Sequence, residues 1–330
     1  MIGQLRRRQF HVLVMVVAFG CMCAALTVGG GCGHQPQTQL RIGINAWPGY
    51  ELIYLAQERG YFAAEGLEVK LIEFGSLSDA RRAYETGKID GLATTVVEVL
   101  MARDAVDRDL RVVRLFNFSD GADVIVAAQG IADARQLRGK KVGVELASLG
   151  IYVLSRALEL NGLTLDDVVP LAKDQRTMSE ELASGQLDAV VTYPPESASM
   201  LAKPGFHIVF STKGIPGEVV DVLALDGSIT RENPERVRAL NRAVDRAYEF
   251  LKSHPTEACR IMGEREGRTG EEFRQLLSDG ITLVSPVEQK SYFGEHGKLH
   301  PVVDHVARSL RKVKLISSRP EVADCLATHD

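Results

Sequence analysis

The chain has 330 residues with an ordinary globular composition, 45% hydrophobic, 25% charged and 6% aromatic. Its formal net charge is −4 at pH 7, and because three arginines and no acidic residue fall in residues 1–31, residues 32–330 carry −7. A negative chain argues against a nucleic-acid partner, which calls for a basic face. The length is sufficient for two domains or one large one.

The N-terminal residues have the order of a secretory signal. Arg6, Arg7 and Arg8 form a positive start, and a largely apolar run follows from Val12 to Val28. The run has about 17 residues, near the lower limit for a bilayer span, so an uncleaved membrane anchor is the alternative to a cleaved signal. We expect residues 1–31 to be a signal peptide.

Three glycines stand directly before Cys32. Small residues before a cysteine resemble a bacterial lipoprotein cleavage site, although Gly29 occupies the position where such sites usually have leucine. We expect lipidation at Cys32 and a polar tether at residues 32–39, which makes the protein periplasmic, or extracytoplasmic, and membrane-anchored. The negative charge leaves the lipid, rather than a basic patch, as the contact with the membrane.

The rest of the chain contains only two cysteines, Cys259 and Cys325. An oxidising compartment permits them to pair, and two buried thiols are the alternative. No cysteine–histidine cluster has the spacing of a zinc site, so we expect no metal and no other cofactor.

From residue 40 onward, short apolar runs alternate with helical patterns, as in a parallel sheet covered by helices. The first series predicts strand 40–45, helix 51–60, strand 67–74, helix 79–86, strand 89–93, helix 96–103 and strand 110–116. After a strand at 124–128 the pattern restarts with strand 140–145, helix 150–161, strand 168–173, helix 179–184 and strands 189–192, 207–211 and 219–225. Beyond Arg231 the chain is mostly helical to about Arg311, and Pro234 begins a long helix that ends at Ser253.

Several motifs, in a fixed order, carry a family resemblance. Residues 41–50 read Arg-Ile-Gly-Ile-Asn-Ala-Trp-Pro-Gly-Tyr, and residues 56–69 contain Ala-Gln-Glu-Arg-Gly-Tyr-Phe followed by Glu-Gly-Leu-Glu-Val. Further matches lie at residues 87–91, 137–144, 161–168 and 184–189. This set, spread over roughly residues 40–285, resembles the nitrate/sulfonate/bicarbonate and thiamine-pyrimidine-precursor (NMT1/THI5-like) family of ABC-transporter substrate-binding proteins. The chain departs from it at residues 192–196, Thr-Tyr-Pro-Pro-Glu, where the family often has a tryptophan before Glu-Pro.

The resemblance implies an α/β fold of two lobes, the type II-like clamp of periplasmic binding proteins, which closes on a small ligand by a hinge motion. Its implied partners are an ABC permease and the ATPase of that importer. We assign residues 40–122 and 223–330 to lobe one and residues 123–222 to lobe two, with the C-terminal helices packed on lobe one. A single doubly wound sheet is the alternative.

In open α/β sheets, ligands bind beyond the carboxyl ends of the strands. That rule selects twelve candidate ligand-binding residues: Trp47, Tyr50, Ser76, Thr94, Thr95, Asp120, Asp123, Glu145, Ser148, Tyr193, Glu196 and Asp221. The tryptophan is either a wall for a flat ligand or a packed aromatic, and the threonines either cap a helix or present donors to a ligand. Each carboxylate taken alone is more typical of a cap, a turn or a solvated side chain, and only the collection of them indicates a cleft.

The acidic candidates, with Glu218, fall in loops that carry no arginine or lysine. An anionic ligand would be repelled there, by about 4 kcal/mol for two unit charges 4 Å apart at an effective dielectric near 20. We therefore predict a small polar ligand that is cationic or rich in N–H donors, such as an amine, amidine, amide or aminopyrimidine, with sulfonate or nitrate as the alternative. Lys173 and Arg176 are the nearest basic side chains, and an inward orientation of both would favour a zwitterion.

The sequence lacks the motifs of two common enzyme classes. Neither Gly43 nor Gly143 begins a Gly-x-Gly-x-x-Gly turn, and no Gly-x-Ser-x-Gly elbow occurs. Fungal pyrimidine-precursor synthases that resemble this family carry a cysteine-rich metal motif that this chain lacks. We expect a binding protein without catalytic residues, and the alternatives are an enzyme of the same fold and a ligand receptor for a membrane sensor.

Overall fold

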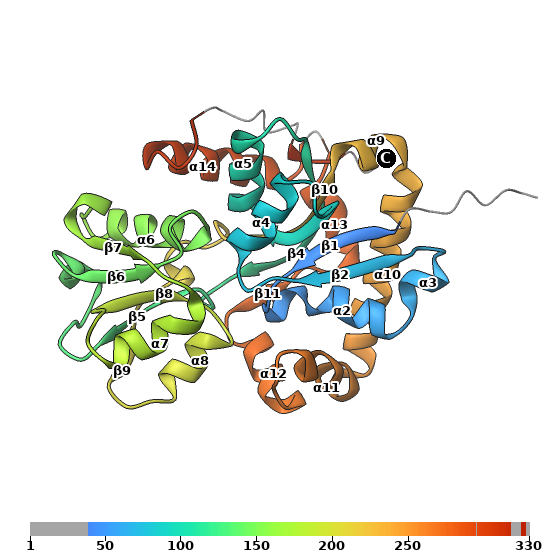
Figure 1. Cartoon of the computed structure of the whole chain (residues 1–330). Coiled ribbons are helices and arrows are strands. Elements are labelled where there is room, and N and C mark those ends of the chain that lie inside the picture. Colours follow the sequence, from blue (N-terminus) through green and yellow to red (C-terminus); the bar gives the residue numbers. More distant parts are fainter. Residues whose placement is uncertain (1–38, 295, 318–324, 328–330) are drawn as a thin grey trace, which may run out of the picture. The chain divides into compact units, whose positions relative to one another are not determined.

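The computed structural model describes residues 39–294, 296–317 and 325–327 (Figure 1). The predicted signal peptide, the lipidation site Cys32 and all of the predicted tether except Gln39 lie outside the described residues. Within the described ranges, no helix combines the length and the hydrophobicity that crossing a bilayer requires.

The first sheet has six described strands in the order β11-β4-β10-β3-β1-β2. Their bounds are β1 (Leu40–Ile44), β2 (Val69–Glu73), β3 (Gly91–Thr95), β4 (Leu110–Ser119), β10 (Val220–Asp226) and β11 (Ile281–Leu283). Strand β1 runs parallel to β2 and β3, whereas β10 runs antiparallel to both β3 and β4. The antiparallel strand is the return of the chain from the second sheet.

The second sheet has five described strands in the order β7-β6-β8-β5-β9, drawn in green and yellow in Figure 1. Their bounds are β5 (Val124–Ala128), β6 (Lys141–Val144), β7 (Val169–Ala172), β8 (Ala189–Thr192) and β9 (Phe206–Ser211). Strand β6 is parallel to β7 and β8, and β5 is antiparallel to β8 and β9. The chain therefore leaves the first sheet after β4 and returns to it at β10.

Helices flank both sheets. Lobe two contains α6 (Leu149–Leu160), α7 (Gln175–Ala183) and α8 (Glu196–Leu201), and short 3-10 turns at Ala134–Leu137, Leu165–Asp167 and Thr212–Gly214. Lobe one contains the turn Pro48–Tyr50 and α2 (Glu51–Glu58), α3 (Tyr61–Ala64), α4 (Leu77–Glu85), α5 (Val96–Ala105), α9 (Gly227–Glu232), α10 (Pro234–Ser253), α11 (Pro255–Arg265), α12 (Gly270–Ser278), α13 (Pro286–Tyr292) and α14 (Leu299–Lys312).

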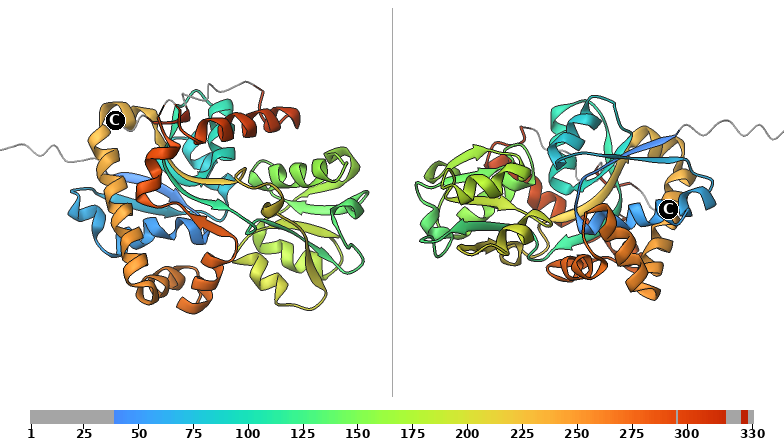
Figure 2. Two further views of the ribbon diagram at one scale, coloured as in Figure 1. Left: turned by 180° about the vertical axis from the view of Figure 1, so that it is seen from behind. Right: turned by 60° about the horizontal axis from the view of Figure 1, so that its bottom comes forward.

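The C-terminal helices pack on lobe one, as predicted. Helix α10 contacts α2 and α3, α11 contacts α2, and α14 contacts α5. Figure 2 shows the gold α10 alongside the blue helices of lobe one. The reason lies in the pattern of α10, whose buried residues Val237, Leu240, Val244, Ala247 and Leu251 recur every three or four positions and form one apolar face.

The two-lobed α/β fold is thus confirmed, and a single doubly wound sheet is wrong for this chain. The assignment of individual residues to lobes stays a prediction; the crossings lie between Ser119 and Val124 and between Ser211 and Val220. Four short elements, β11, α3, α8 and α9, were not predicted, because they are too short to show a periodic pattern. Cys259 is a buried thiol, so the disulfide that the sequence left open is not formed.

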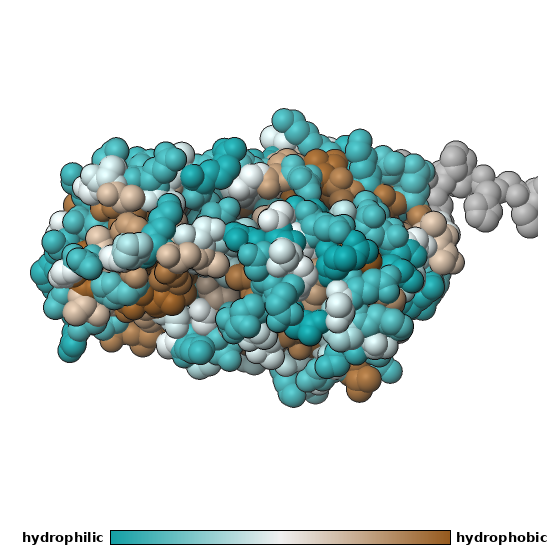
Figure 3. Space-filling model, turned by 90° about the horizontal axis from the view of Figure 1, so that it is seen from below, coloured by the Kyte–Doolittle hydropathy of each residue, from teal (hydrophilic) through white to brown (hydrophobic). Residues whose placement is uncertain are grey.

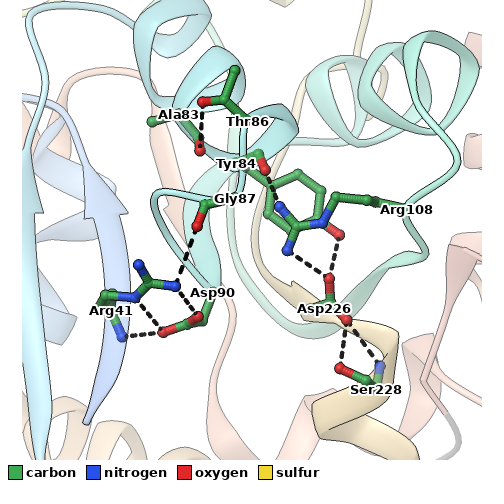
Figure 4. Close-up of polar contacts among 9 residues, drawn as sticks. All are labelled: Arg41, Ala83, Tyr84, Thr86, Gly87, Asp90, Arg108, Asp226 and Ser228. Atoms are coloured by element: carbon green, nitrogen blue, oxygen red, sulfur yellow. Dashed lines mark hydrogen bonds and ion pairs between the residues drawn. The ribbon is translucent and has the colours of Figure 1, made fainter.

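Ion pairs join segments of lobe one that are distant in sequence (Figure 4). The Arg41 guanidinium donates to both oxygens of Asp90, with a shortest distance of 2.6 Å, and links the start of β1 to the loop before β3. Arg108 donates to Asp226 at 2.8 Å, and the Tyr84 hydroxyl donates to the same carboxylate at 3.2 Å. These contacts fix the end of the sheet where β1 begins and β10 ends.

Apolar surface is limited. The exposed large hydrophobic side chains of the described residues are Leu146, Leu160, Val169, Ile208 and Val287. The first four belong to lobe two, and Figure 3 shows a hydrophobic area on the face of that lobe seen from below. Single exposed apolar residues are normal on a soluble surface, so they indicate no binding site by themselves.

One buried ion pair connects the C-terminal helices to the end of β1. Arg265, on α11, donates to the fully buried carboxylate of Glu51 on α2, with Nε–Oε2 at 2.8 Å. The same guanidinium donates to Glu73 at 2.6 Å and to the carbonyl of Asn45 at 3.2 Å. Arg265 therefore holds both the buried carboxylate and the backbone immediately after β1.

We predict that Arg265→Met lowers the free energy of unfolding by about 3–5 kcal/mol, because it leaves the Glu51 charge buried without its partner. Chemical denaturation monitored by circular dichroism measures this loss. The matched control is Arg260→Met on the same helix, whose pair with Glu264 is more than half exposed and should cost about 1 kcal/mol or less. Equal losses in the two variants would contradict the structural role given to Arg265.

Candidate ligand-binding site

A small cavity of about 10 Å³, with room for about one water molecule, lies between the two sheets. Its lining residues come from both lobes: Asn45, Trp47, Tyr50, Leu77, Thr95, Asp123, Leu149, Tyr193 and Asp221. The segments after β1 and β8, together with the last residue of β3, supply five of them, which is where strand order places a ligand site. The two aspartates lie at the crossings, one directly before β5 and one at the start of β10.

Asp123 and Asp221 are the charged groups of this cavity. Both are buried, 3% and 2% exposed, and one oxygen of each, Oδ2, has no hydrogen-bond partner among the described residues. The other oxygen of Asp221 accepts a hydrogen bond from the Tyr50 hydroxyl at 2.6 Å. A buried acceptor without a partner costs about 1–3 kcal/mol, so this arrangement does not serve stability.

Burial disfavours the charged form of each carboxyl. It raises the pKa of Asp123 to about 7, against the lowering effect of a hydrogen bond from Ser119. Burial likewise raises the pKa of Asp221 well above its ordinary value, and the hydrogen bond from Tyr50 opposes the rise. The negative charges of Glu98 and Asp123 add to the effect at Asp221. Such strongly perturbed carboxyls in a cavity are typical of functional sites.

Neutral polar groups in the lining, and one residue outside it, also lack hydrogen-bond partners among the described residues. Oδ1 of Asn45 and Nε1 of Trp47 are buried and have no hydrogen-bond partner within the described residues. The same holds for both polar atoms of Asn117, which lies on β4 beside Gly49. A Cβ at Gly49 would stand 2.1 Å from Asn117 Nδ2, so only glycine lets this amide approach the turn. None of the nine lining residues is a lysine, an arginine or a histidine.

Aromatic rings form one wall. The rings of Trp47 and Tyr193 meet edge to face with centroids 6.1 Å apart, and the Tyr50 ring lies 6.3 Å from Trp47 on the other side. Trp47 and Tyr193 come from different lobes, so the wall is complete only where the lobes meet. Flat apolar faces together with a few polar atoms are usual in small-molecule sites.

Glu98 links the lobes directly behind the cavity. One oxygen accepts hydrogen bonds from the Ser148 hydroxyl at 2.6 Å and from the Leu149 backbone N–H at 2.9 Å, both in lobe two. The other oxygen accepts from the Thr95 hydroxyl in lobe one. The Glu98 side chain is fully buried.

The structure brings half of the twelve sequence-predicted residues into the cavity lining: Trp47, Tyr50, Thr95, Asp123, Tyr193 and Asp221. Ser148 reaches its edge through Glu98. Ser76 instead caps α4 by accepting the Asp79 N–H, and Thr94 is buried in β3 with its hydroxyl unpartnered among the described residues. Asp120 is exposed and lies outside the lining.

The other predicted carboxylates have roles away from the lining. Burial raises the pKa of Glu145 to about 7, and its carboxylate accepts a hydrogen bond from Gln175 at 3.2 Å. Glu196 is half-buried at the start of α8, and burial also raises its pKa. Glu218 does not belong with the cleft carboxylates; it pairs with Arg156 at 2.8 Å and accepts from the Tyr152 hydroxyl at 2.7 Å.

Neither basic candidate turns into the cavity. Lys173 pairs with Glu181 at 2.5 Å, and the largely exposed Arg176 pairs with Asp174 at 2.7 Å. The condition under which the sequence favoured a zwitterionic ligand is therefore not met.

Sequence reasoning missed three important residues. Asn45 directly follows the first strand, so the rule that ligands bind beyond the carboxyl ends of strands applies to it as well. Glu98 is a lone charge within the apolar run Val96–Leu100, which is a signal of a buried carboxylate. Asn117 lies inside a strand, and no local pattern distinguishes it.

The sequence model of the family described as NMT1/THI5 like matches residues 47–258. The chain is 25% identical to the 4-amino-5-hydroxymethyl-2-methylpyrimidine phosphate synthase of Aspergillus parasiticus, over 85% of this chain and 81% of that protein. It is 26% identical to the formylaminopyrimidine-binding protein of Halalkalibacterium halodurans, over 64% and 66% of the two chains.

Among solved structures, the alkanesulfonate-binding protein SsuA of Xanthomonas axonopodis pv. citri bound to MOPS superposes with a TM-score of 0.75 at 18% identity. The match covers 87% of this chain and 97% of that one, and it shows a shared fold. Since the family model covers more than half of the chain, from Trp47 in the cavity to Ala258 on α11, this protein belongs to the NMT1/THI5-like family.

Proposed function

We propose that this protein is the extracytoplasmic solute-binding component of an ABC importer, which binds a small nitrogen-containing ligand between its lobes and delivers it to a permease. The ligand is cationic or rich in N–H donors. The observation that carries the proposal is the pair of buried aspartates, Asp123 and Asp221. Each has an oxygen without a partner among the described residues, at a cavity whose lining contains no basic residue.

The lining has hydrogen-bond acceptors that no donor of the described residues reaches, and this favours a ligand that supplies the donors. Two carboxyl groups and the Asn45 amide oxygen offer acceptors, and an N–H donor from the ligand would satisfy them. A cationic ligand would also favour the ionised form of both aspartates and reverse the cost of their burial. The cavity has room for only about one water molecule, so a ligand can enter only when the lobes move apart.

An aminopyrimidine fits these requirements. It has amino donors for the aspartate oxygens and a flat face for the rings of Trp47 and Tyr193. The name of the Halalkalibacterium relative, a formylaminopyrimidine-binding protein, supports this class of ligand. Amines, amidines and amides satisfy the same acceptors and remain within the proposal.

Sulfonate or nitrate is the alternative ligand, and the SsuA structure shows that the fold accommodates a sulfonate-binding protein. Such anions need several N–H donors, most often from arginine. The lining offers two carboxyl groups and no basic side chain instead, and a carboxyl that ionises there would repel an anion. The charge of the site therefore favours a nitrogenous ligand over an anion.

An enzyme acting on a pyrimidine is a second candidate, favoured by the name of the Aspergillus relative. A binding protein returns its ligand unchanged, whereas an enzyme converts it. The two are distinguished by mass spectrometry of the ligand after incubation, and conversion at a rate proportional to protein concentration would favour the enzyme.

Ligand class is tested with the protein lacking residues 1–31. Trp47 is the only tryptophan of the chain and lines the cavity, so its fluorescence reports occupancy directly. We expect aminopyrimidines, amidines or amines to change this emission and to raise Tm. At a ligand concentration 100 times Kd, the free energy of unfolding should rise by about 2.7 kcal/mol. A response to sulfonates or nitrate with none from the nitrogenous set would refute the proposed ligand class.

The raised pKa of Asp123 predicts opposite effects of Asp123→Asn on stability and on binding. The folded carboxyl keeps its proton up to about pH 7, whereas the unfolded one loses it near pH 4, so the wild-type protein loses stability as the pH rises from about 4 to 7. The asparagine variant avoids this loss. It should gain about 2–4 kcal/mol at pH 8, with the difference vanishing near pH 4, and bind the ligand at least about tenfold more weakly.

Denaturation curves at pH 4, 6 and 8 measure the first effect, and Trp47 fluorescence titrations measure the second. Asp120→Asn is the matched control, because Asp120 is exposed and outside the lining. Its stability and affinity should remain within about 0.5 kcal/mol of the wild-type values. A destabilised Asp123→Asn protein at pH 8 would contradict the assignment of a costly buried charge.

The membrane tether belongs to the same proposal. We expect the full chain to be lipidated at Cys32 and to sediment with membranes when expressed in a bacterium. Cys32→Ser should shift it to the soluble fraction, since a triacylated terminus supplies the membrane affinity that one chain alone does not. Cys21→Ser is the control, and equal release of both variants, or of neither, would contradict lipidation at Cys32.

A further inference from the structure

The N-terminus of α6 is capped by a side chain from the other lobe. Ser148, which directly precedes the helix, forms no side-chain cap of its own. Instead, its hydroxyl and the Leu149 backbone N–H both donate to the same oxygen of Glu98, at 2.6 and 2.9 Å. Glu98 belongs to α5 of lobe one, so this cap joins the two lobes.

A helix N-terminus attracts anions, because its first N–H groups are unpaired within the helix and its dipole is positive at that end. Helix α6 has 12 residues, and Leu149 at its start lines the cavity. In this protein a side chain of the same chain, that of Glu98, already accepts a hydrogen bond from this end of the helix. The Glu98 carboxylate occupies the position that an anionic group of a ligand would otherwise take.

The groups around this cap also disfavour the binding of a second anion. Thr95, whose hydroxyl donates to the other oxygen of Glu98, lines the cavity together with Asp123. The unpartnered Oδ2 of Asp123 is an additional buried acceptor, and the charge of Glu98 contributes to the raised pKa of both aspartates. An incoming anion would therefore meet acceptors and negative charge where the backbone donors are already engaged.

We infer that Glu98 is a specificity-determining residue: by capping α6 across the lobes, it removes from the cleft a helix N-terminus that would bind anions and thereby restricts the site to ligands without a negative group there. The inference rests on the proposed function, because it explains the ligand class of the same site. It also gives Glu98 a role in closure, since the cap forms only where α5 and α6 meet.

Removing the carboxylate should therefore create an anion site. In Glu98→Ala, the Leu149 N–H and the Ser148 hydroxyl lose their acceptor, and a small carboxylate such as acetate has the right group to replace it. Glu98→Gln fills the same volume without the charge and should leave no room for acetate. The two variants separate the loss of charge from the opening of space.

The test uses the protein without residues 1–31, with acetate as the probe and acetamide as its neutral analogue. We expect saturating acetate to raise the Tm of Glu98→Ala by about 3 °C or more and to change Trp47 fluorescence. Acetamide should produce a smaller effect on that variant, and acetate should not change the fluorescence of the wild-type protein or of Glu98→Gln. Nitrate and methanesulfonate extend the comparison to other anions.

Glu272→Ala is the matched control. Glu272 also accepts a helix-terminal N–H, that of Thr269 at 2.8 Å, but it is exposed on α12 and outside the cavity lining. Its removal should give no acetate-dependent change in Trp47 fluorescence. If Glu98→Ala unfolds during purification, its refolding yield in acetate compared with acetamide provides the same test.

The outcomes distinguish this inference from the proposed function. A Glu98→Ala protein that folds, binds the nitrogenous probes and ignores acetate would overturn the inference alone. A wild-type protein that binds acetate at Trp47 as strongly as the variant would also overturn it. An acetate response confined to Glu98→Ala supports the inference, and a simultaneous absence of any nitrogenous ligand for the wild-type protein would count only against the proposed function.

Discussion

Acidic side chains are buried between two sheets without a basic partner in the cavity that they border. Asp123 and Asp221 stand at the two crossings of the chain, so the same topology that creates two lobes also brings these carboxyls together. Arginines pair with two other carboxylates that are buried or partly buried, Arg265 with Glu51 and Arg156 with Glu218. The contrast matters, because the chain has ample arginine and places none in the lining.

This arrangement works against stability, and the proposed binding function accounts for it. The cavity keeps polar atoms of Asn45, Trp47 and both aspartates without partners among the described residues. A core selected for stability alone would satisfy or remove such groups. The surrounding structure limits the cost through the Tyr50 hydroxyl on Asp221 and through Ser119 near Asp123. The acceptor oxygens that remain without partners are the groups that, on our proposal, accept hydrogen bonds from the ligand.

The sequence predicted most of the strands and longer helices, because their apolar periods are local, and the strand-end rule found six lining residues. It failed where a role depends on a distant partner. Glu218 and Asp221 both flank the return crossing, so the sequence places them alike. In the structure Glu218 instead forms an ion pair with Arg156 of α6, outside the cavity. Likewise, the use of Glu98 depends on the approach of α6 from the other lobe, which no pattern within α5 reveals. The ligand class was predicted from the absence of basic residues, and Lys173 and Arg176 are indeed engaged elsewhere.

The fold itself does not choose between anions and cations. A sulfonate-binding structure superposes on this chain over most of its length, and sequence relatives are named for pyrimidines. In this protein the N-terminus of α6 lies at the cleft, and a helix N-terminus is positive in any sequence. What differs is the partner that the sequence gives it. Here the carboxylate of Glu98 accepts hydrogen bonds from that end across the lobes, and the carboxyl groups left at the cavity are those of Asp123 and Asp221. On our proposal, these two groups determine which ligands the site accepts.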